Sequence, residues 1–225
     1  MELSNATECR VTITGISPLL LHADDVLAKD ELDAERDKLK RTSQKEFSAG
    51  DDRCPPWTWR YYLHHDDDHV ALPAEMLASP LAKAGARVTL KKPKSYKELA
   101  VCGVVFGDLY SPILVNGKPI DWPKIKALNG TFPEIHKLVR AMGFDLYVRR
   151  LTIGKGAKAS KHVRVRPMFK TWSIVTNVQI VDPQLSAAKL QEIWTIAGLY
   201  FGYGDWRPCS PNNPGRFGRF TVTIA

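Results

Sequence analysis

The sequence predicts an α+β protein. Stretches with alternating β-branched residues, typical of strands, are interspersed with stretches whose apolar residues recur at helical spacing. The two patterns alternate unevenly, and short turns of the kind found in antiparallel hairpins lie between several of the strand-like stretches. The chain has no internal repeat and no low-complexity linker. We therefore expect residues 1–225 to form a single domain.

The first part of the chain predicts strands, an acidic helix and a second helix. The alternation that begins at Val11 favours a strand, and Pro73 is suited to the first turn of a helix because its missing N–H is not needed there. In chain order we expect a strand over residues 11–16 ended by residues 18–22, a charge-rich solvated helix over 24–45, a loop over 50–56, strands over 57–63 and 69–72 around an acidic turn, and a helix from Pro73 that stops at Gly85.

The rest of the chain predicts hairpins and two further helices. Asn116-Gly117 is a strong hairpin signal, because both residues tolerate the left-handed backbone that a tight turn requires. In chain order we expect a basic loop over 91–94, a strand region over 101–115, the Asn116-Gly117 turn, a helix over 133–142, long strands over 147–153 and 163–181 around a Gly/Lys/Ser loop, a helix over 184–199 capped near Gly198, and a closing strand over 217–224.

Composition excludes several classes of protein. Six Trp, seven Tyr and eight Phe supply the apolar surface that a folded core needs. The cysteines are scattered with no CxxC pair, which argues against a zinc ribbon or a disulfide framework and favours a reducing compartment: Cys9, Cys54, Cys102 and Cys209. The sequence contains no apolar run of membrane-spanning length, and its first residues lack the pattern of a secretory signal. We expect a cytoplasmic protein without a membrane partner.

Charge is distributed unevenly along the chain. Residues 1–75 contain nine Lys/Arg and sixteen Asp/Glu, whereas residues 76–225 contain twenty-three and eight, giving net charges of −7 and +15. An acidic N-terminal part followed by a basic body favours a polyanionic partner for the body. A solvated surface with uneven charge is the alternative.

The strongest basic segment lies between residues 149 and 170, and no acidic residue occurs between Asp145 and Asp182. Small residues separate its lysines, so we expect an exposed hairpin whose cations lie along phosphates: Arg149, Arg150, Lys155, Lys158, Lys161, Arg164, Arg166 and Lys170. The neighbouring Phe169 and Trp172 could stack on bases, although core positions are more common for such residues. The 91–94 loop adds Lys91, Lys92 and Lys94 to the candidate contacts.

A glycine-rich segment near the C-terminus is the second candidate. It reads GYGDWRP over residues 202–208 and GRFGRF over 215–220. Glycines between aromatic and basic residues could let backbone amides face an anion, and an ordinary helix-to-strand turn is the alternative. The candidate residues are Gly202, Gly204, Arg207, Gly215, Arg216, Gly218 and Arg219. In an unbroken strand Arg216 and Arg219 would face opposite ways, so a cradle for an anion needs a bend or bulge at Gly218. Phe217 would then point away from the anion and enter the core.

This C-terminal segment resembles the glycine-rich loop of the RAMP superfamily, the ferredoxin-like RNA-handling proteins of CRISPR systems. Residues 70–81 (VALPAEMLASPL) are similar to a strand-to-helix segment of the superfamily's backbone subunits. The resemblance covers about forty residues and implies a ferredoxin-like (RRM-like) antiparallel sheet with helices on one face, RNA or single-strand binding, and assembly into filaments or larger complexes. A CRISPR component and a phage or mobile-element relative remain equally admissible. Asp205, Trp206 and the proline-rich residues 208–214 depart from the compact loop of the family.

Two histidine-containing segments are candidates for catalysis and metal binding. Repeat-cleaving endoribonucleases of this superfamily often have a catalytic His in the region of His22, where an imidazole could move a proton without a metal. A packing role for His22 is the alternative.

Residues 64–69 (HHDDDH) carry possible metal ligands, but six consecutive residues in a tight turn cannot all converge on one ion. We expect no metal and no cofactor.

Three functions remain open from sequence. The first is a non-catalytic protein that binds RNA or single-stranded DNA, together with other subunits or copies of itself. The second is a metal-independent endoribonuclease that uses His22. The third is a phage-type interaction protein whose basic face binds an acidic protein.

Overall fold

The computed structural model confirms the α+β class. It describes residues 6–23, 30–35, 37, 51–53, 58–154, 159–210 and 214–225. The main sheet is antiparallel, with strands in the order β12–β1–β11–β7–β3, and β6 and β8 pair with β11 and β7. These strands are β1 (Thr7–Gly15), β3 (Ala71–Pro73), β6 (Val104–Phe106), β7 (Tyr110–Val115), β8 (Lys118–Pro119), β11 (Ser173–Ile180) and β12 (Phe220–Ile224).

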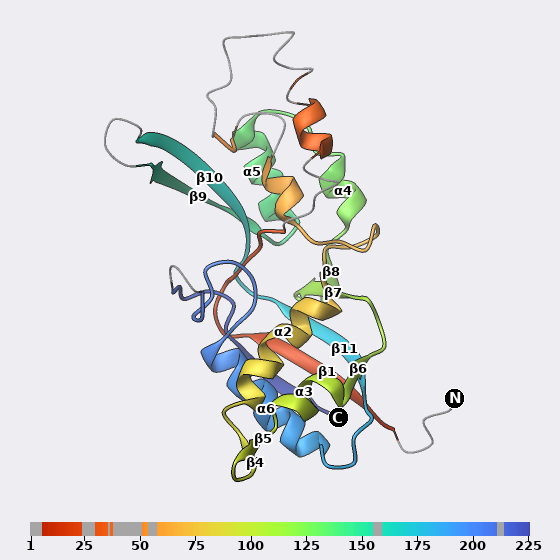
Figure 1. Ribbon diagram of the computed structural model, residues 1–225. Helices are drawn as coiled ribbons and strands as arrows, with labels where there is room; N and C mark the ends of the chain where they lie inside the picture. The colour runs from red at the N-terminus through yellow and green to blue at the C-terminus, as the bar shows by residue number, and fades with distance from the viewer. Residues whose placement is uncertain are drawn as a thin grey trace.

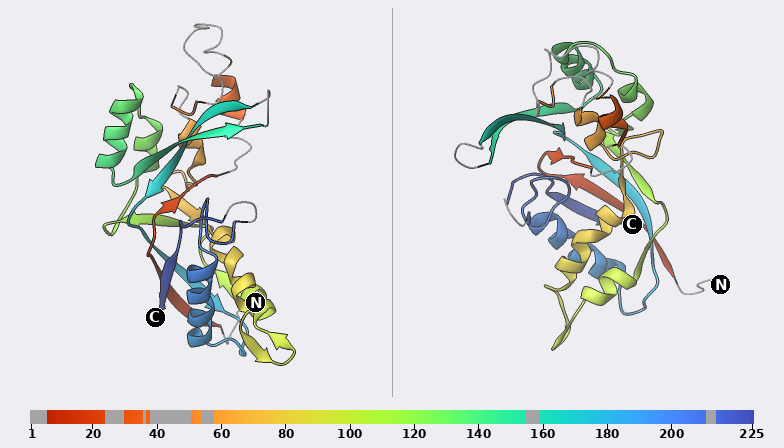
Figure 2. Two further views of the ribbon diagram at one scale, coloured as in Figure 1. Left: turned by 90° about the vertical axis from the view of Figure 1, so that its left-hand side faces the viewer. Right: turned by 45° about the horizontal axis from the view of Figure 1, so that its top comes forward.

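Helices α2 (Ala74–Gly85), α3 (Lys97–Cys102) and α6 (Ala187–Tyr200) lie on one face of the main sheet (Figures 1 and 2). Their buried residues include Leu77 and Leu81 of α2 and Leu190, Ile193 and Trp194 of α6. Because this apolar side of each helix packs toward the alternating apolar residues of the strands, the helices and the sheet enclose the core between them.

A second group of elements lies at the other end of the molecule, toward the top of Figure 1. A smaller antiparallel sheet contains β2 (Leu19–Leu20), β10 (Ser160–Phe169) and β9 (Asp145–Ile153), and the β9–β10 hairpin projects from the body. Near it lie the 3₁₀ helix η1 (Thr58–Tyr62), α4 (Trp122–Lys126), α5 (Phe132–Ala141) and the helical residues 30–35. The hairpin β4 (Thr89–Lys91) and β5 (Lys94–Ser95) is at the opposite end of the molecule.

Asp145, the first residue of β9, ties the hairpin to α5. Its carboxylate lies 2.6 Å from His136 Nε2 and 3.1 Å from Arg140 Nε, and Lys170 Nζ lies 3.1 Å away. Burial alone would raise the pKa of Asp145, but hydrogen bonds from His136, Arg140, Lys170 and the Leu146 amide outweigh it and hold that pKa far below its usual range. This charged carboxylate fixes the base of the projecting hairpin.

Several predicted elements are confirmed by the structure. The first strand, the helix after Pro73, the helix near residues 133–142 and the closing strand are present as β1, α2, α5 and β12. Asn116 and Gly117 have φ values of 51° and 75°, as a type I′ turn between β7 and β8 requires. Of the expected acidic helix, residues 30–35 are helical and most of the remainder lies outside the described residues.

Other predicted elements are wrong. Residues 58–62 form η1 instead of a strand, because Trp59 is fully buried and Arg60 donates to the carbonyls of Lys126 and Leu128. The region 101–115 contains the end of α3 and two separate strands, and the long strand over 163–181 is interrupted between β10 and β11. Gly198 does not cap α6, which continues to Tyr200; a Cβ there would collide with the Phe220 carbonyl, so this glycine allows α6 to approach β12.

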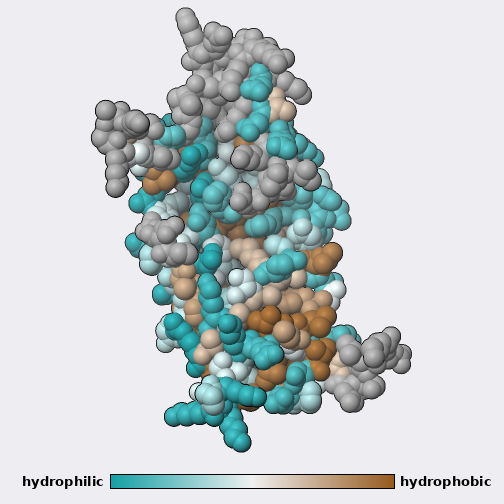
Figure 3. Space-filling model, in the orientation of Figure 1, coloured by the Kyte–Doolittle hydropathy of each residue, from teal (hydrophilic) through white to brown (hydrophobic). Residues whose placement is uncertain are grey.

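Some large apolar side chains remain outside the core. Val101, Val105 and Leu109 are 52%, 44% and 75% exposed, and apolar residues gather on the face of the molecule drawn in Figure 3, over the region of α2, α3 and β6. None of the helices in the described part of the chain combines the length and apolar character needed for a membrane span.

Candidate nucleic-acid interface

One face of the β9–β10 hairpin carries both cations and an aromatic ring. In the antiparallel register Arg149 is opposite Arg164, and Tyr147 is opposite Arg166. Residues that are directly opposite, or two apart on one strand, point to the same face of a sheet. The hairpin therefore presents these three arginines and Tyr147 together, whereas Arg150 belongs to the other face.

A buried carboxylate holds two of these arginines in place. Asp52 is fully buried beside β10, where its amide donates to the Val163 carbonyl. Its carboxylate accepts the Val165 amide at 3.1 Å and pairs with Arg164 at 3.1 Å and Arg166 at 3.7 Å. Arg166 also donates from Nε to Asp205 at 3.2 Å. Both guanidinium groups are thus oriented before any ligand arrives, which lowers the entropy lost on binding.

Trp206 forms the opposite wall of this site. Its φ of 55° is unusual for a bulky residue, and hydrogen bonds of its own backbone stabilise this conformation. The Asp205 carboxylate accepts the Trp206 amide at 2.9 Å, and the Trp206 carbonyl accepts the Phe217 amide at 3.3 Å. The bend turns the indole toward the hairpin, where the Arg149 guanidinium lies 4.1 Å from the ring centroid. Phe217 stacks on Trp206, and Tyr147 meets both rings edge-on.

A pocket of about 240 Å³ lies between the hairpin and the glycine-rich segment. Its wall consists of Tyr147, Arg149, Leu151, Arg164, Arg166, Asp205, Trp206 and Ser210. Asp52 and Asp205 offset part of the charge of the three arginines. Among the described residues no carboxylate pairs with Arg149, so the pocket, which we call the hairpin pocket, keeps a net positive charge next to aromatic rings.

Three further predicted cations of the hairpin are described by the structure, and they do not line this pocket. Arg150 and Lys161 are exposed on the other face of the strands, and Lys170 pairs with Asp145. Lys155 and Lys158 lie outside the described residues. The predicted stacking residues Phe169 and Trp172 are in the core, 0% and 3% exposed, so they are unable to stack on a base.

The glycines of the C-terminal segment are explained by close packing. A Cβ on Gly204 or Gly218 would collide with the backbone carbonyl of Leu20 or Tyr203, and both have positive φ. The amides of Gly202, Gly215 and Gly218 donate to the carbonyls of Ala197, Arg207 and Pro18. These three amides are therefore engaged within the protein instead of facing an anion. The backbone is not a continuous strand at Gly218, whose φ is 71°, but Phe217 is half-buried beside Trp206 and does not enter the core.

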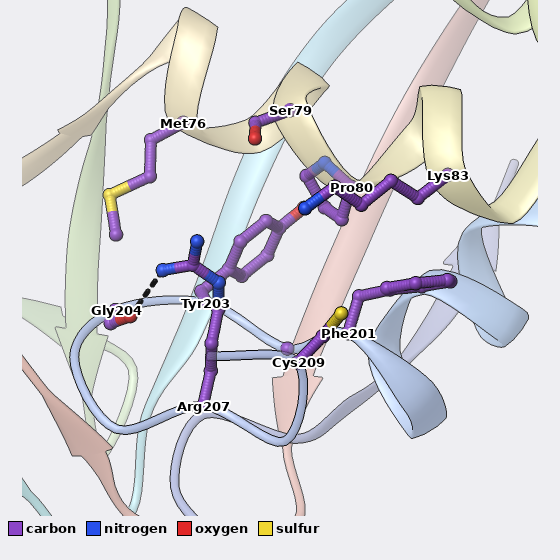
Figure 4. Close-up of a pocket in the computed structure, with 10 residues that line it drawn as sticks. Met76, Ser79, Pro80, Lys83, Phe201, Tyr203, Gly204, Arg207 and Cys209 are labelled. Atoms are coloured by element: carbon purple, nitrogen blue, oxygen red, sulfur yellow. Dashed lines mark hydrogen bonds between the residues drawn. The ribbon is translucent and has the colours of Figure 1, made fainter. Parts of the chain in front are cut away.

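The arginines of this segment point to different places. Arg207 donates to the Gly204 carbonyl at 3.0 Å and lines a separate cavity of about 100 Å³ between the segment and α2, with Lys83, Tyr203 and Cys209 (Figure 4). Arg216 and Arg219 are exposed. Lys91, Lys92 and Lys94 are also exposed, but they belong to the β4–β5 hairpin at the far end of the molecule.

His22 is connected to Arg166 of the hairpin through the ring of Tyr62. Its ring meets Tyr62 edge-on at 4.5 Å, and the Arg166 guanidinium lies 4.3 Å from the centroid of the same Tyr62 ring. Burial raises the pKa of the Tyr62 hydroxyl, so Tyr62 stays protonated at neutral pH and could donate a proton but not accept one.

The 64–69 segment forms a turn. Asp66 accepts the amides of Asp68 and His69 at 3.1 and 2.6 Å, and His65 stacks on Trp122 at 4.2 Å. No group of three or more His, Cys, Asp or Glu residues within the described ranges is arranged to hold a metal ion.

Sequence reasoning missed Tyr147 and the stacking role of Trp206 in the wall of the hairpin pocket, and it missed Asp52 and Tyr62, which contact the arginines of the pocket. Tyr147 could have been found, because it is two residues before Arg149 on a predicted strand and must share its face. Asp52 and Trp206 gave no such signal, since the contacts of Asp52 with Arg164 join residues 112 positions apart.

Comparison with known proteins adds no relative to this description. The chain matches no protein-family model, and no curated protein matches its sequence. The chemistry of the hairpin pocket therefore has to be inferred from its own residues and geometry.

Proposed function

We propose that this protein binds RNA or single-stranded DNA through the hairpin pocket. The observation that carries the proposal is the Arg149 guanidinium stacked on Trp206 beside the fixed guanidinium groups of Arg164 and Arg166. Unpaired bases stack on aromatic and guanidinium planes, and guanidinium groups bind the phosphates between them. In a double helix the base faces are covered by the neighbouring base pairs, so this combination favours a single strand.

The order of the elements supports a ferredoxin-like fold of the RAMP type. β1, α2, β6 with β7, β11, α6 and β12 follow one another as β-α-β-β-α-β, and β1 lies between β12 and β11 in the sheet. The helices of this unit lie on one face. We propose on this basis that the protein belongs among the RNA-handling proteins with that architecture.

We also propose that the protein acts as a non-catalytic subunit of a ribonucleoprotein or filament. The exposed apolar side chains of Val101, Val105 and Leu109 and the apolar patch in Figure 3 support a contact with another protein chain or with a second copy, because monomeric soluble proteins rarely expose large apolar patches.

A pair of matched variants tests the binding site. Arg149 and Arg150 are adjacent, exposed and equally charged, but only Arg149 lies on Trp206. We expect Arg149→Ala to weaken binding of a fluorescently labelled single-stranded oligonucleotide by about tenfold at moderate salt, whereas Arg150→Ala changes it much less. Trp206→Ala should weaken binding by about 5- to 150-fold, since a base–aromatic stack contributes about 1–3 kcal/mol. Fluorescence anisotropy with ribo- and deoxyribo-oligomers measures both effects and separates RNA from DNA.

Equal losses in Arg149→Ala and Arg150→Ala would mean that charge alone matters and would remove the hairpin pocket from the interface. If the wild-type protein binds no oligonucleotide even at about 50 mM salt, where phosphate contacts are strongest, the nucleic-acid proposal is wrong and an acidic protein becomes the better partner for the basic face.

A metal-independent endoribonuclease is the second candidate, because His22 meets Tyr62 edge-on and the Arg166 guanidinium lies against the same Tyr62 ring. An imidazole can take the 2′-hydroxyl proton, and an arginine can stabilise the charged phosphate. Tyr62 cannot serve as the second base at neutral pH. We therefore expect the wild-type protein to bind RNA without cleaving it; site-specific, chelator-resistant cleavage that is lost in His22→Ala would favour the enzyme instead.

A further inference from the structure

The hairpin pocket has room for one base. Its volume of about 240 Å³ is below the ~300–1,000 Å³ of pockets that enclose drug-sized ligands, and its apolar and aromatic lining comes from Tyr147, Leu151 and Trp206. A base that leaves the stack of a single strand can insert here while its phosphates remain near Arg149 and Arg164. The residue that reads the edge of the base must then come from the polar groups of the wall.

Asp205 is the acceptor on that wall. Its side chain is 37% exposed, and both carboxylate oxygens are fixed from behind: one accepts the Trp206 amide at 2.9 Å, and the other accepts Arg166 Nε at 3.2 Å. Each carboxylate oxygen can accept two hydrogen bonds, so each retains capacity for one more. The carboxylate thus offers two adjacent acceptors in a fixed orientation.

Guanine is the base that matches two adjacent acceptors. Its Watson–Crick edge presents the N1–H and N2–H donors side by side. The Watson–Crick edges of adenine and cytosine each carry one exocyclic donor next to a ring acceptor, and the carboxylate repels that acceptor. The same edge of uracil carries one N–H between two carbonyls. We propose that the hairpin pocket preferentially binds a single unpaired guanine, with Asp205 as the residue that determines the preference. This inference rests on the proposed nucleic-acid-binding function and makes it more specific.

Uridine hexamers with guanosine, inosine, adenosine or uridine at one central position provide the test. Inosine lacks only the N2 amino group, so it removes one of the two hydrogen bonds while the protein is unchanged. In wild-type protein we expect the guanosine hexamer to bind about tenfold more tightly than the uridine hexamer, as a bidentate contact allows. The inosine hexamer should lose most of that gain.

Asp205→Asn is the matched protein variant, because an amide offers one acceptor and one donor in nearly the same shape. We expect the difference in affinity between the guanosine and inosine hexamers to disappear in this variant, whatever happens to its overall affinity, because the second acceptor has been lost. Circular dichroism melting shows whether the variant is folded.

The outcomes separate the two proposals. A wild-type protein that binds all four hexamers alike would overturn the guanine preference and leave the nucleic-acid proposal standing. The same would follow if Asp205→Asn kept the difference between guanosine and inosine. A wild-type protein that binds no hexamer would overturn both.

Discussion

Two glycines with nearly the same backbone torsion have different surroundings. Gly117 and Gly218 have φ values of 75° and 71°, but an added Cβ meets nothing within 4 Å at Gly117 and collides with the Tyr203 carbonyl at Gly218. A side chain therefore destabilises the fold at both positions because the backbone is left-handed. At Gly218 it destabilises the fold further because it collides with a neighbouring backbone.

We expect Gly117→Ala to lower the free energy of unfolding by about 1 kcal/mol, the usual cost of a left-handed Ala. Gly218→Ala should cost clearly more, because the Tyr203 backbone has to move. Urea unfolding of both variants measures the difference. Equal losses would show that the segment yields easily and that close packing does not explain Gly218.

Single residues also show why the hairpin pocket was only partly predictable. Its cations could be found, because a run of Lys and Arg without acids is visible in a sequence. Their roles could not, because the partners that divide them into fixed and free groups come from distant segments. Asp52 fixes Arg164 and Arg166, whereas Trp206 stacks on Arg149. No local pattern indicates either partner.

At the scale of elements, local patterns predicted strands and helices wherever long-range packing agreed with them. The aromatic-rich residues 57–63 have high strand propensity, yet residues 58–62 form η1. Burial of Trp59 and the hydrogen bonds of Arg60 to carbonyls at and just after the end of α4 decide the backbone there. The break between β10 and β11 likewise depends on tertiary contacts: the Trp172 carbonyl accepts the Gly15 amide, and its indole donates to the Ser17 carbonyl.

The contact between α5 and the β9–β10 hairpin makes a prediction about acid stability. The pKa of Asp145 lies below its unfolded value, so this carboxylate stabilises the fold above about pH 4 and the stabilisation is lost as the pH falls toward the folded-state pKa. We expect Asp145→Asn to lower the free energy of unfolding at pH 7 by about 1–3 kcal/mol. Relative to wild type, its stability should also decline less between about pH 4 and pH 2.

Asp108→Asn is the control, because Asp108 is exposed and the substitution makes the same change in net charge. Chemical unfolding at several pH values compares the three proteins. If Asp145→Asn followed the same pH dependence as wild type, the network of His136, Arg140 and Lys170 would not be a source of acid sensitivity.

At the scale of the whole molecule, the basic residues fall into separate groups. The hairpin carries one group, Arg216 and Arg219 belong to the glycine-rich segment, and Lys91, Lys92 and Lys94 lie at the far end. A short strand held in the hairpin pocket cannot reach the far group, whereas a long strand or a neighbouring copy could bring nucleic acid there. The length of the oligonucleotide therefore distinguishes local binding from binding along the whole molecule.

The dependence of binding on salt measures these groups separately. For single strands, the slope of log affinity against log salt changes by about 0.7 for each phosphate that the protein no longer neutralises. We expect the triple variant Lys155→Ala, Lys158→Ala, Lys161→Ala to flatten the slope by about 1–2 for an oligomer of roughly six nucleotides, with affinity reduced for every sequence.

The variant with Lys91, Lys92 and Lys94 replaced by Ala is the control. It has the same reduced charge, and it should leave the slope for this short oligomer unchanged. A smaller slope only with long oligomers would place the far lysines on the path of the strand. An unchanged slope in the first triple variant would remove those hairpin lysines from the interface, while the hairpin pocket would still be tested by Arg149→Ala.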